Sequence, residues 1–273
     1  MIAFPNCKIN LGLNVIAKRS DGYHDLQTIL LPVPVNDTLE IIPSEKTSLA
    51  LTGLQIEGAP GSNLCIKAYE LLRSKFSLPP VQIHLHKVIP AGSGLGGGSS
   101  DAAFTLQLLN QKFNLGLALN ELIDLAAELG SDCPFFILNR PAYGTGRGDM
   151  LQPLDLSQLN PYFGLIVNPG LHISTAWAFQ QIVPKPSAEP LREVIKNPLA
   201  NWKLILGNDF EEPVFGLYPE LSEIKAQLYK AGALYASLSG SGSALYGLFE
   251  NLPTIQFPNT YFVKSFPLIQ QAS

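Results

Sequence analysis

Hydrophobic and polar residues alternate near the start of the chain. Between Ile9 and Val15 every second residue is apolar, and the residues between them are Asn10, Gly12 and Asn14. This period of two predicts a β-strand with one apolar and one polar face. Similar patterns predict further strands at residues 26–33, 38–42, 48–51, 81–89, 162–167, 236–239 and 244–249.

Asn63, Asn120 and Ser174 are residue types that cap helices, and each precedes a stretch with helical spacing of apolar residues. Helices are predicted at residues 64–76, 99–113, 121–129, 175–182 and 221–230. Strands and helices in this irregular order indicate an α+β fold rather than a regular βαβ series. The glycine-rich stretch Gly144–Gly148 indicates a boundary just behind it, so we expect two domains, at residues 1–150 and 151–273.

The composition is that of a folded protein without a nucleic-acid partner. Hydrophobic residues make up 46% of the 273 residues and charged residues 15%, which excludes global disorder. The net charge is −4, and Lys and Arg form no run that could bind nucleic acid. A phosphorylated ligand would therefore be held by local groups rather than by a general positive field.

Three features favour a cytoplasmic protein over a secreted or membrane-bound one. Cys7, Cys65 and Cys133 are far apart and match no disulfide framework or metal spacing, so reduced thiols are expected. Residues 1–10 lack the apolar core of a secretory signal. Residues 158–184 carry no charge but are interrupted by Pro and Gly, so we expect a strand, a turn and a helix there rather than a membrane span.

The clearest chemical signal is the glycine-rich segment Pro90–Ser100, which follows a predicted strand and leads into a predicted helix. Glycines let the backbone approach a ligand closely, and the first N–H groups of a helix have no partner within the helix. Together with the helix dipole, these groups form a site for anions such as phosphates. A flexible Gly/Ser linker is the alternative, but linkers rarely join a strand directly to a helix start.

Two better-known phosphate motifs do not account for this segment. Gly92, Gly94 and Gly97 fit the G-x-G-x-x-G pattern, but the acidic residue expected about 20 positions further on would need a second strand, and that region is predicted to be helical. This argues against a dinucleotide-dependent oxidoreductase. The Walker A motif needs a lysine that is missing after Gly98. We therefore expect backbone amides to hold the phosphates, with Lys87 as the nearest upstream cation.

A phosphate site alone does not make a kinase. Phosphoryl transfer also needs groups that activate the acceptor hydroxyl and offset negative charge. Lys8 and Asn10 lie two apart on the first predicted strand, so they point to the same face. Asp132 stands in a short turn, because the helix is predicted to stop at Gly130 and Pro134 is expected to prevent its continuation. Such an acid is expected to be partly buried and to need a partner. From the turn alone, a catalytic carboxylate and one that bonds its own backbone fit about equally well.

Three segments together carry a family resemblance: Cys7–Leu11, Pro90–Ala103 and Leu238–Ala244. Over nearly its whole length the chain resembles the GHMP kinase superfamily of galactokinase, homoserine kinase and mevalonate kinase. Two further segments, Arg19–Thr28 and Leu129–Pro134, are most similar to members that phosphorylate the 2-hydroxyl of a methylerythritol joined to cytidine diphosphate. Those members belong to the non-mevalonate route to isoprenoid precursors. Asp101 departs from the pattern of some members, which have an amide at that position.

The resemblance implies a two-domain GHMP kinase fold with the active site between the domains, and MgATP as the phosphoryl donor. It implies that Asp132 is the general base and that Lys8 stabilises the transferred charge. Substrate binding is implied for Asn10, Tyr23, His24, Asp132, Thr175 and Phe179. Nucleotide binding is implied for Asn63, Lys87, Pro90, Ala91, Gly92, Ser93, Gly94, Leu95, Gly96, Gly97, Gly98, Ser99 and Ser100. No side chain is implied as a metal ligand.

Within that set, Tyr23, His24 and Phe179 match the pocket for the cytosine ring, and Thr175 the diphosphate region. Without the resemblance, Tyr23 and His24 would be interpreted as an ordinary strand start and Phe179 as a core residue.

Other functions on the same scaffold stay open at this point. They are phosphorylation of a mevalonate-like or homoserine-like substrate, or ATP-dependent decarboxylation. A non-catalytic nucleotide-binding protein is a further alternative, which the presence of Lys8 and Asp132 disfavours. We expect a small-molecule substrate that carries cytidine diphosphate, no membrane partner, and a monomer or weak homodimer.

Overall fold

The computed structural model describes residues 1–56, 60–187 and 189–268, and these form two compact units. The first unit comprises Met1–Cys7, the described part of Pro34–Ala91, and Gly96–Asn139. The second comprises Lys8–Val33, Gly92–Leu95 and the described residues from Arg140 onward. The units are thus built from interleaved segments of chain, and the division of the family's domains at residue 150 stays a prediction.

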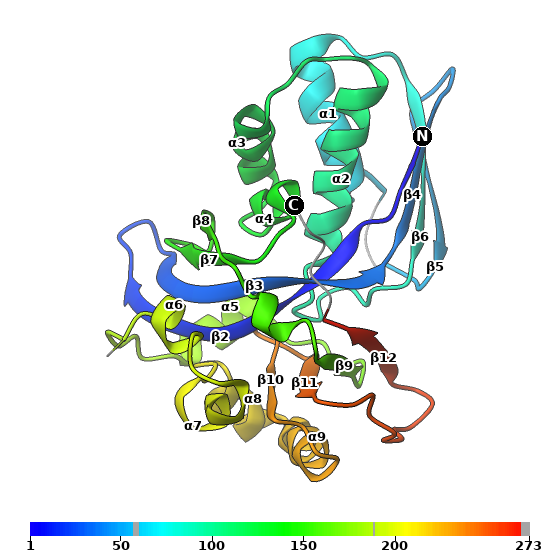
Figure 1. Ribbon diagram of the computed structural model, residues 1–273. Helices are drawn as coiled ribbons and strands as arrows, with labels where there is room; N and C mark the ends of the chain where they lie inside the picture. The colour runs from blue at the N-terminus through cyan, green and yellow to red at the C-terminus, as the bar shows by residue number, and fades with distance from the viewer. Residues whose placement is uncertain (57–59, 188, 269–273) are drawn as a thin grey trace. The chain divides into compact units, whose positions relative to one another are not determined.

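The first unit is a four-stranded sheet with helices on one side (Figure 1). The strand order is β1-β4-β6-β5, and only β5 and β6 pair in parallel. The strands are β1 (Ile2–Ala3), β4 (Thr38–Pro43), β5 (Ser48–Gly53) and β6 (Val81–Lys87). The helices are η1 (Pro60–Ser62), α1 (Leu64–Phe76), α2 (Gly97–Lys112), α3 (Leu119–Leu129) and α4 (Cys133–Leu138). Leu39 and Ile41 of β4 are fully buried because α2 packs against this sheet.

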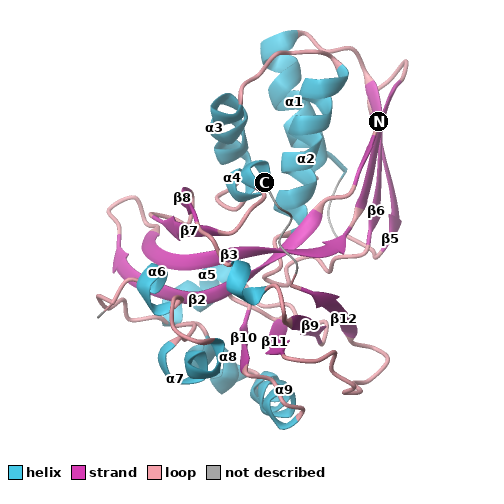
Figure 2. Cartoon of the chain, viewed as in Figure 1, coloured by secondary structure: helices cyan, strands magenta, loops and turns pink. Residues whose placement is uncertain are grey.

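The second unit contains two further four-stranded sheets, drawn as magenta arrows in Figure 2. One sheet has the order β2-β3-β7-β8, and the other, β10-β11-β9-β12, is antiparallel throughout. The strands are β2 (Asn6–Lys18), β3 (His24–Asn36), β7 (Ala142–Thr145), β8 (Met150–Pro153), β9 (Phe163–Asn168), β10 (Tyr235–Leu238), β11 (Leu245–Phe249) and β12 (Phe262–Pro267). Residues Lys8–Val33 of β2, β3 and their connection belong to this unit.

Short helices surround the sheets of the second unit. They are η2 (Ser157–Leu159), α5 (Thr175–Gln181), α6 (Leu191–Val194), η3 (Leu199–Asn201), α7 (Trp202–Ile205), α8 (Glu211–Leu217) and α9 (Pro219–Lys230). The core of the unit joins Val15 of β2, Val167 of β9, Val214 of α8 and Leu228 of α9, each fully buried. Burial of such side chains is the main term that holds these elements together.

The elements predicted from hydrophobic spacing are present, with ends shifted by a few residues. Two of the predicted caps are confirmed: Asn63 accepts a 2.9 Å hydrogen bond from the N–H of Cys65, and Ser174 accepts one of 3.3 Å from the N–H of Trp177. Residues 158–184 form β9, a turn and α5, as expected. Within the described ranges, no helix has the length and apolar character needed to cross a bilayer.

Two local predictions are wrong. Helix α2 begins at Gly97 rather than at Ser99. The cap of α3 is Ala118 rather than Asn120, and Glu121 satisfies the N–H of Ala118 at 2.8 Å instead. Helix α3 does end at Leu129 with Gly130 as its C-cap, as predicted, but a separate helix, α4, then starts at Cys133. Pro134 is tolerated in the first turn of α4, where its missing N–H is not needed.

Strand β2 also differs from the expected half-buried strand, because its residues are buried on both faces from Cys7 to Leu13. Lys8 and Asn10 are each only 3% exposed. Their polar face is thus an interior one, and buried polar groups there need hydrogen-bond partners.

Candidate active site

Helix α2 begins at an open glycine-rich turn. Its N-cap, Gly96, has φ 72° and no side chain, so the first N–H groups of the helix gain no cap from it. Gly98 is exposed, and a Cβ built there would come no nearer to another residue than 3.9 Å, at Leu64. Ser100 is fully buried, and its hydroxyl has no hydrogen-bond partner within the described chain. Uncapped amides, an open backbone and an unsatisfied hydroxyl fit an anion such as a phosphate.

Lys87 lies beneath this turn. A Cβ built on Gly97 would be 2.8 Å from the side chain of Ile89 and 3.4 Å from Nζ of Lys87, so only glycine fits there. The Lys87 ammonium contacts Asp101 at 2.7 Å and also bonds Asp37, and all three side chains are at most 4% exposed. Burial alone would lower the pKa of Lys87, but the carboxylates of Asp101 and Asp37 outweigh it and raise that pKa.

The middle of the glycine-rich segment belongs to the second unit and is held there by backbone contacts. The N–H of Lys8 donates to the carbonyl of Leu95 at 2.9 Å, and the N–H of Ala244 donates to the carbonyl of Ser93 at 2.9 Å. A Cβ built on Gly94 would lie 1.9 Å from the carbonyl oxygen of Ser239. Residue 94 must therefore be glycine for these two backbones to approach so closely.

The ammonium of Lys8 is fixed within the second unit. It donates to Oδ1 of Asn10 at 2.6 Å and to the carbonyl oxygen of Gly94 at 2.9 Å. The hydroxyl of Ser239 donates to the same carbonyl at 2.9 Å. The three segments that carried the resemblance, around Lys8, Gly94 and Ser239, thus meet at one backbone oxygen. Their hydrogen bonds leave the lysine side chain with little rotational freedom.

Asn10 is held by Thr28, the last residue of the Arg19–Thr28 segment, and by Tyr246, which the sequence did not single out. Its Nδ2 donates to Thr28 Oγ1 at 2.9 Å, and that hydroxyl donates to the carbonyl of Gly12 at 2.7 Å. The hydroxyl of Tyr246 donates to the backbone carbonyl of Asn10 at 2.6 Å. Tyr246 lies far from Asn10 in sequence and carries no motif, so local pattern had no means of finding it. The Arg19–Thr28 segment likewise gave no sign that Thr28 bonds Asn10.

Asp132, in the first unit, is the N-cap of α4 but does not cap that helix with its side chain. It is partly buried, as expected. The catalytic role of Asp132 stays a prediction. Burial raises the pKa of the neighbouring Cys133 thiol to about 11, which keeps the thiol neutral beside the carboxylate.

The residues expected at the cytosine ring lie in the second unit. The rings of His24 and Phe179 stack with centroids 4.9 Å apart and an interplanar angle of 12°. Phe210 meets Phe179 edge-on at 4.9 Å. Burial lowers the pKa of His24, and the positive charge of Lys18 adds to the effect, so the imidazole is neutral near pH 7. No further ring fits between His24 and Phe179 in this arrangement.

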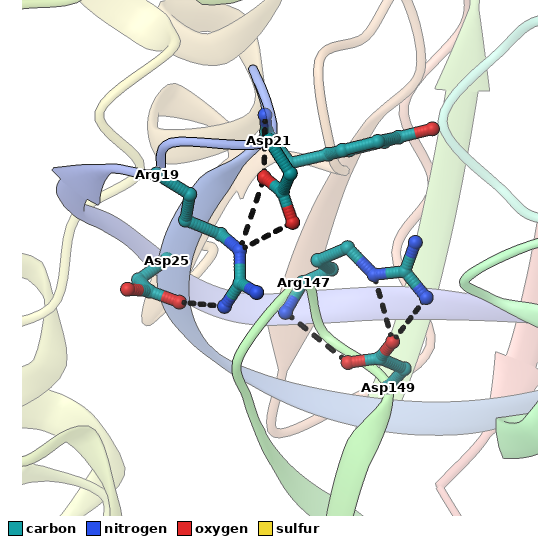
Figure 3. Close-up of polar contacts among 6 residues, drawn as sticks. Arg19, Asp21, Asp25, Arg147 and Asp149 are labelled. Carbon is teal, nitrogen blue, oxygen red and sulfur yellow. Dashed lines mark hydrogen bonds and ion pairs between the residues drawn. The ribbon is translucent and has the colours of Figure 1, made fainter.

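Tyr23 is 56% exposed and has its own charged neighbours. The guanidinium of Arg147 lies 5.1 Å from the centre of the Tyr23 ring, a cation–π distance. Arg147 is bonded by Asp149 at 3.0 and 2.8 Å, as Figure 3 shows. In the same view Arg19 bridges Asp21 and Asp25. The Arg147 guanidinium therefore has a fixed position beside the tyrosine.

Thr175 stands at the start of α5, and its Oγ1 is 3.0 Å from Oγ of Ser241. Each hydroxyl can donate and accept a hydrogen bond. One hydroxyl can therefore bond an anionic group while its hydrogen bond to the other hydroxyl keeps it in position. Of the residues predicted for nucleotide binding, Asn63 uses its carboxamide oxygen to cap α1. The nucleotide and substrate roles of all these residues stay predictions.

Two family models match the chain, described as the GHMP kinases N terminal domain over residues 63–140 and GHMP kinases C terminal over residues 187–256. The chain is 52% identical over 254 residues to a Bacteroides fragilis protein named 4-diphosphocytidyl-2-C-methyl-D-erythritol kinase, covering 92% of each chain. The chain belongs to the GHMP kinase family. Family membership makes it a kinase that uses ATP, and it confirms the two-domain α+β GHMP fold expected from the sequence.

Two more relatives of this GHMP kinase carry the same name. A Cytophaga hutchinsonii protein named 4-diphosphocytidyl-2-C-methyl-D-erythritol kinase is 47% identical over 265 residues, covering 97% of this chain and 98% of the relative. A crystal structure of 4-(cytidine 5'-diphospho)-2C-methyl-D-erythritol kinase is 34% identical and superposes with a TM-score of 0.78 over 91% of this chain and 90% of the other. The resemblance given by the motifs is thus confirmed at the level of the family.

Proposed function

We propose that this GHMP kinase transfers the γ-phosphoryl group of ATP to the 2-hydroxyl of 4-diphosphocytidyl-2-C-methyl-D-erythritol. The reaction belongs to the non-mevalonate route to isoprenoid precursors. The relatives named above are the main support for the substrate, since each covers more than nine-tenths of this chain.

One observation supports the chemistry most directly. Lys8 and Ser239 both donate to the carbonyl of Gly94, in the middle of the phosphate segment. This holds a cation in a set position at the segment where the phosphates are expected. A charge held in advance costs no reorganisation when negative charge develops during phosphoryl transfer, so it lowers the barrier.

In this proposal Asp132 takes the proton from the acceptor hydroxyl, and Lys8 stabilises the charge on the group in transfer. Asn10 positions the acceptor and orients Lys8. A carboxylate is a sufficient base because proton transfer completes only as the new P–O bond forms. The hydrogen bonds that Lys8 donates to Asn10 and Gly94 hold its ammonium in one position.

The nucleotide is assigned to Pro90–Ser100, with Asn63 and Lys87 close to it. The open backbone at Gly98 and the unpartnered hydroxyl of Ser100 fit its phosphates. MgATP supplies the phosphoryl group and a metal ion that neutralises its charge. Among the described residues no three His, Cys, Asp or Glu side chains converge, so we expect Mg²⁺ to be bound mainly through the phosphates.

The cytosine ring is assigned to Tyr23, His24 and Phe179, and the diphosphate to Thr175. Because His24 and Phe179 already stack on each other, the base would contact the exposed ring of Tyr23 and the edge of His24 rather than enter the stack. A neutral imidazole can accept or donate one hydrogen bond to the base edge. Base–aromatic stacking contributes about 1–3 kcal/mol.

We also propose a monomer or weak homodimer in the cytoplasm, and the buried thiols of Cys65 and Cys133 suit such a reducing compartment. A coupled assay of ADP release tests the function, with the cytidyl substrate, mevalonate and homoserine compared side by side. We expect turnover only with the cytidyl substrate. Turnover of mevalonate or homoserine alone would assign this chain to another activity of the family.

A further inference from the structure

A buried cluster of three charged residues lies in the first unit, beneath the start of α2. Nζ of Lys87 is 2.7 Å from Oδ2 of Asp101 and bonds Oδ2 of Asp37 as well. The exposed fractions are 2% for Lys87, 2% for Asp101 and 0% for Asp37. Ionic groups with so little exposure are costly to bury, and replacing such clusters with apolar residues is often neutral or stabilising. Stability alone is therefore a weak reason for this cluster.

The cluster connects both ends of the phosphate segment. The other carboxylate oxygen of Asp37 accepts hydrogen bonds from the N–H groups of Val88 and Ile89, at 2.6 and 2.9 Å, where β6 leads into the segment. Asp101 lies in the second turn of α2, where the segment ends. Lys87 joins the two carboxylates, and its Nζ lies 3.4 Å from the position of a Cβ on Gly97.

The geometry leaves Lys87 poorly placed to bind the nucleotide itself. Its ammonium is enclosed, and two carboxylates already occupy two of its three N–H donors. Oδ1 of Asp101 is buried without a hydrogen-bond partner in the described chain. The carboxylates of Asp37 and Asp101 therefore share the Lys87 ammonium, which is not available to a ligand. An ammonium in this position stabilises the backbone of the phosphate segment rather than binding a ligand.

We propose that Asp37, Lys87 and Asp101 are positioning residues that hold the two ends of the phosphate segment at a fixed separation. The amides of Gly97 and Gly98 are then already arranged for phosphate before the nucleotide binds. This inference rests on the proposed function, since it concerns the same nucleotide. It also changes the role predicted for Lys87, from a nucleotide contact to a support below the loop.

The test measures binding of ADP and of adenosine to the full chain by calorimetry, in the wild type and in Lys87→Met and Asp101→Leu. A disordered loop weakens phosphate binding but not binding of the base and ribose, so ADP affinity is expected to fall about tenfold or more while adenosine affinity is unchanged. The double variant should lose no more than either single one, because both changes break the same support. Asp101→Asn keeps an acceptor for Lys87 and should retain more ADP affinity than Asp101→Leu.

Lys75→Met is the matched control, because it removes the same type of side chain from an exposed ion pair with Glu128 in the same unit. It should leave both affinities unchanged. An equal loss of adenosine and ADP affinity in Lys87→Met would make Lys87 a direct nucleotide contact and overturn the inference. Unchanged ADP affinity in both single variants would also overturn it. Failure of the wild type to bind ADP would instead reject the proposed function. If Lys87→Met does not fold, the two Asp101 variants provide the same comparison.

Discussion

Lys8 donates a 2.6 Å hydrogen bond to Oδ1 of Asn10, two positions further along the same buried strand. The pair shares one face of β2, so the rigid strand sets their separation. Neither side chain can move without breaking a buried hydrogen bond, since Lys8 also bonds Gly94 and Asn10 also bonds Thr28. The position of the charge is therefore a property of the sheet rather than of a flexible lysine.

Lys8→Ala is expected to lower kcat about 100- to 1,000-fold, the usual cost of removing one preorganised charge-stabilising group. The fold is expected to stay intact, because Ser239 still donates to the carbonyl of Gly94. Steady-state kinetics with MgATP and the cytidyl substrate measure the effect. Lys18→Ala, at the exposed end of the same strand, is the control and should retain wild-type kcat. Full activity of Lys8→Ala would remove Lys8 from the mechanism.

Asp132→Asn keeps the shape of the side chain but cannot accept a proton. We expect kcat to fall about 100- to 10,000-fold with the fold intact, because general base catalysis contributes that much. Single-turnover ADP release measures the chemical step directly. Asp124→Asn on the exposed face of α3 serves as the comparison. Equal rates for Asp132→Asn and Asp124→Asn would show that Asp132 is only a turn residue.

Gly94→Ala is expected to be far more damaging than Gly116→Ala. Both glycines have positive φ, at 80° and 71°, so both substitutions carry the same backbone strain of about 1 kcal/mol. A Cβ at residue 94 would collide with the carbonyl oxygen of Ser239, 1.9 Å away, whereas a Cβ at residue 116 would have no atom within 4 Å. Thermal unfolding and the KM for ATP should separate the two. Similar values in both variants would mean that the contact at 94 has no role.

Phe179→Leu is expected to raise the KM for the cytidyl substrate about 5- to 100-fold, because it removes the ring that stacks on His24, and His24 contacts the base in this proposal. The KM for ATP should stay the same. Phe257→Leu is the matched control, since Phe257 also stacks on another ring in this unit, that of Tyr261. An unchanged substrate KM in Phe179→Leu would place the cytosine elsewhere.

The stability of the protein should depend on Asp101 at mildly acidic pH. Burial raises the pKa of Asp101 to about 7, although the positive charge of Lys87 lowers it. The folded state therefore keeps a proton that the unfolded state releases near pH 4. The free energy of unfolding then falls as pH rises from 4 to 7, by up to about 1.4 kcal/mol per pH unit from this group.

Urea unfolding of the wild type and Asp101→Asn between pH 5 and 6.5 measures this dependence. The unfolding free energy of the wild type should fall relative to that of Asp101→Asn as pH rises, because asparagine does not titrate. A difference that stays constant over this range would mean that Asp101 is already ionised in the folded protein.

Local signals predicted much of the fold. Alternation located β2, and the caps Asn63 and Ser174 located the starts of α1 and α5, because these patterns depend on residues a few positions apart. The short helices α6 and α7 and the strands β7, β8 and β12 carry no such pattern and form through tertiary packing. The stop of α3 at Gly130 was predicted, but the new helix α4 was not, because a proline blocks a helix interior and yet suits a first turn.

The site was predictable only where a motif lies in one stretch of chain. Lys8, Gly94 and Ser239 come from three such stretches, and family resemblance grouped them before their contact was known. Thr28 and Tyr246 act on Asn10 from 18 and 236 positions away, and Asp37 reaches Lys87 across 50. A hydrogen bond between positions so distant leaves no periodic trace in a single sequence.

The close approach of Gly94 to Ser239 limits how this kinase can be recombined with its relatives. A chimaera that takes its first half from one homologue and its second half from another separates the origin of residue 94 from that of residue 239. Their backbones lie nearer than any side chain permits, so even small differences in the path of either loop are transmitted to the other. Library designs that exchange the second half should therefore transplant residues 92–95 together with 238–246.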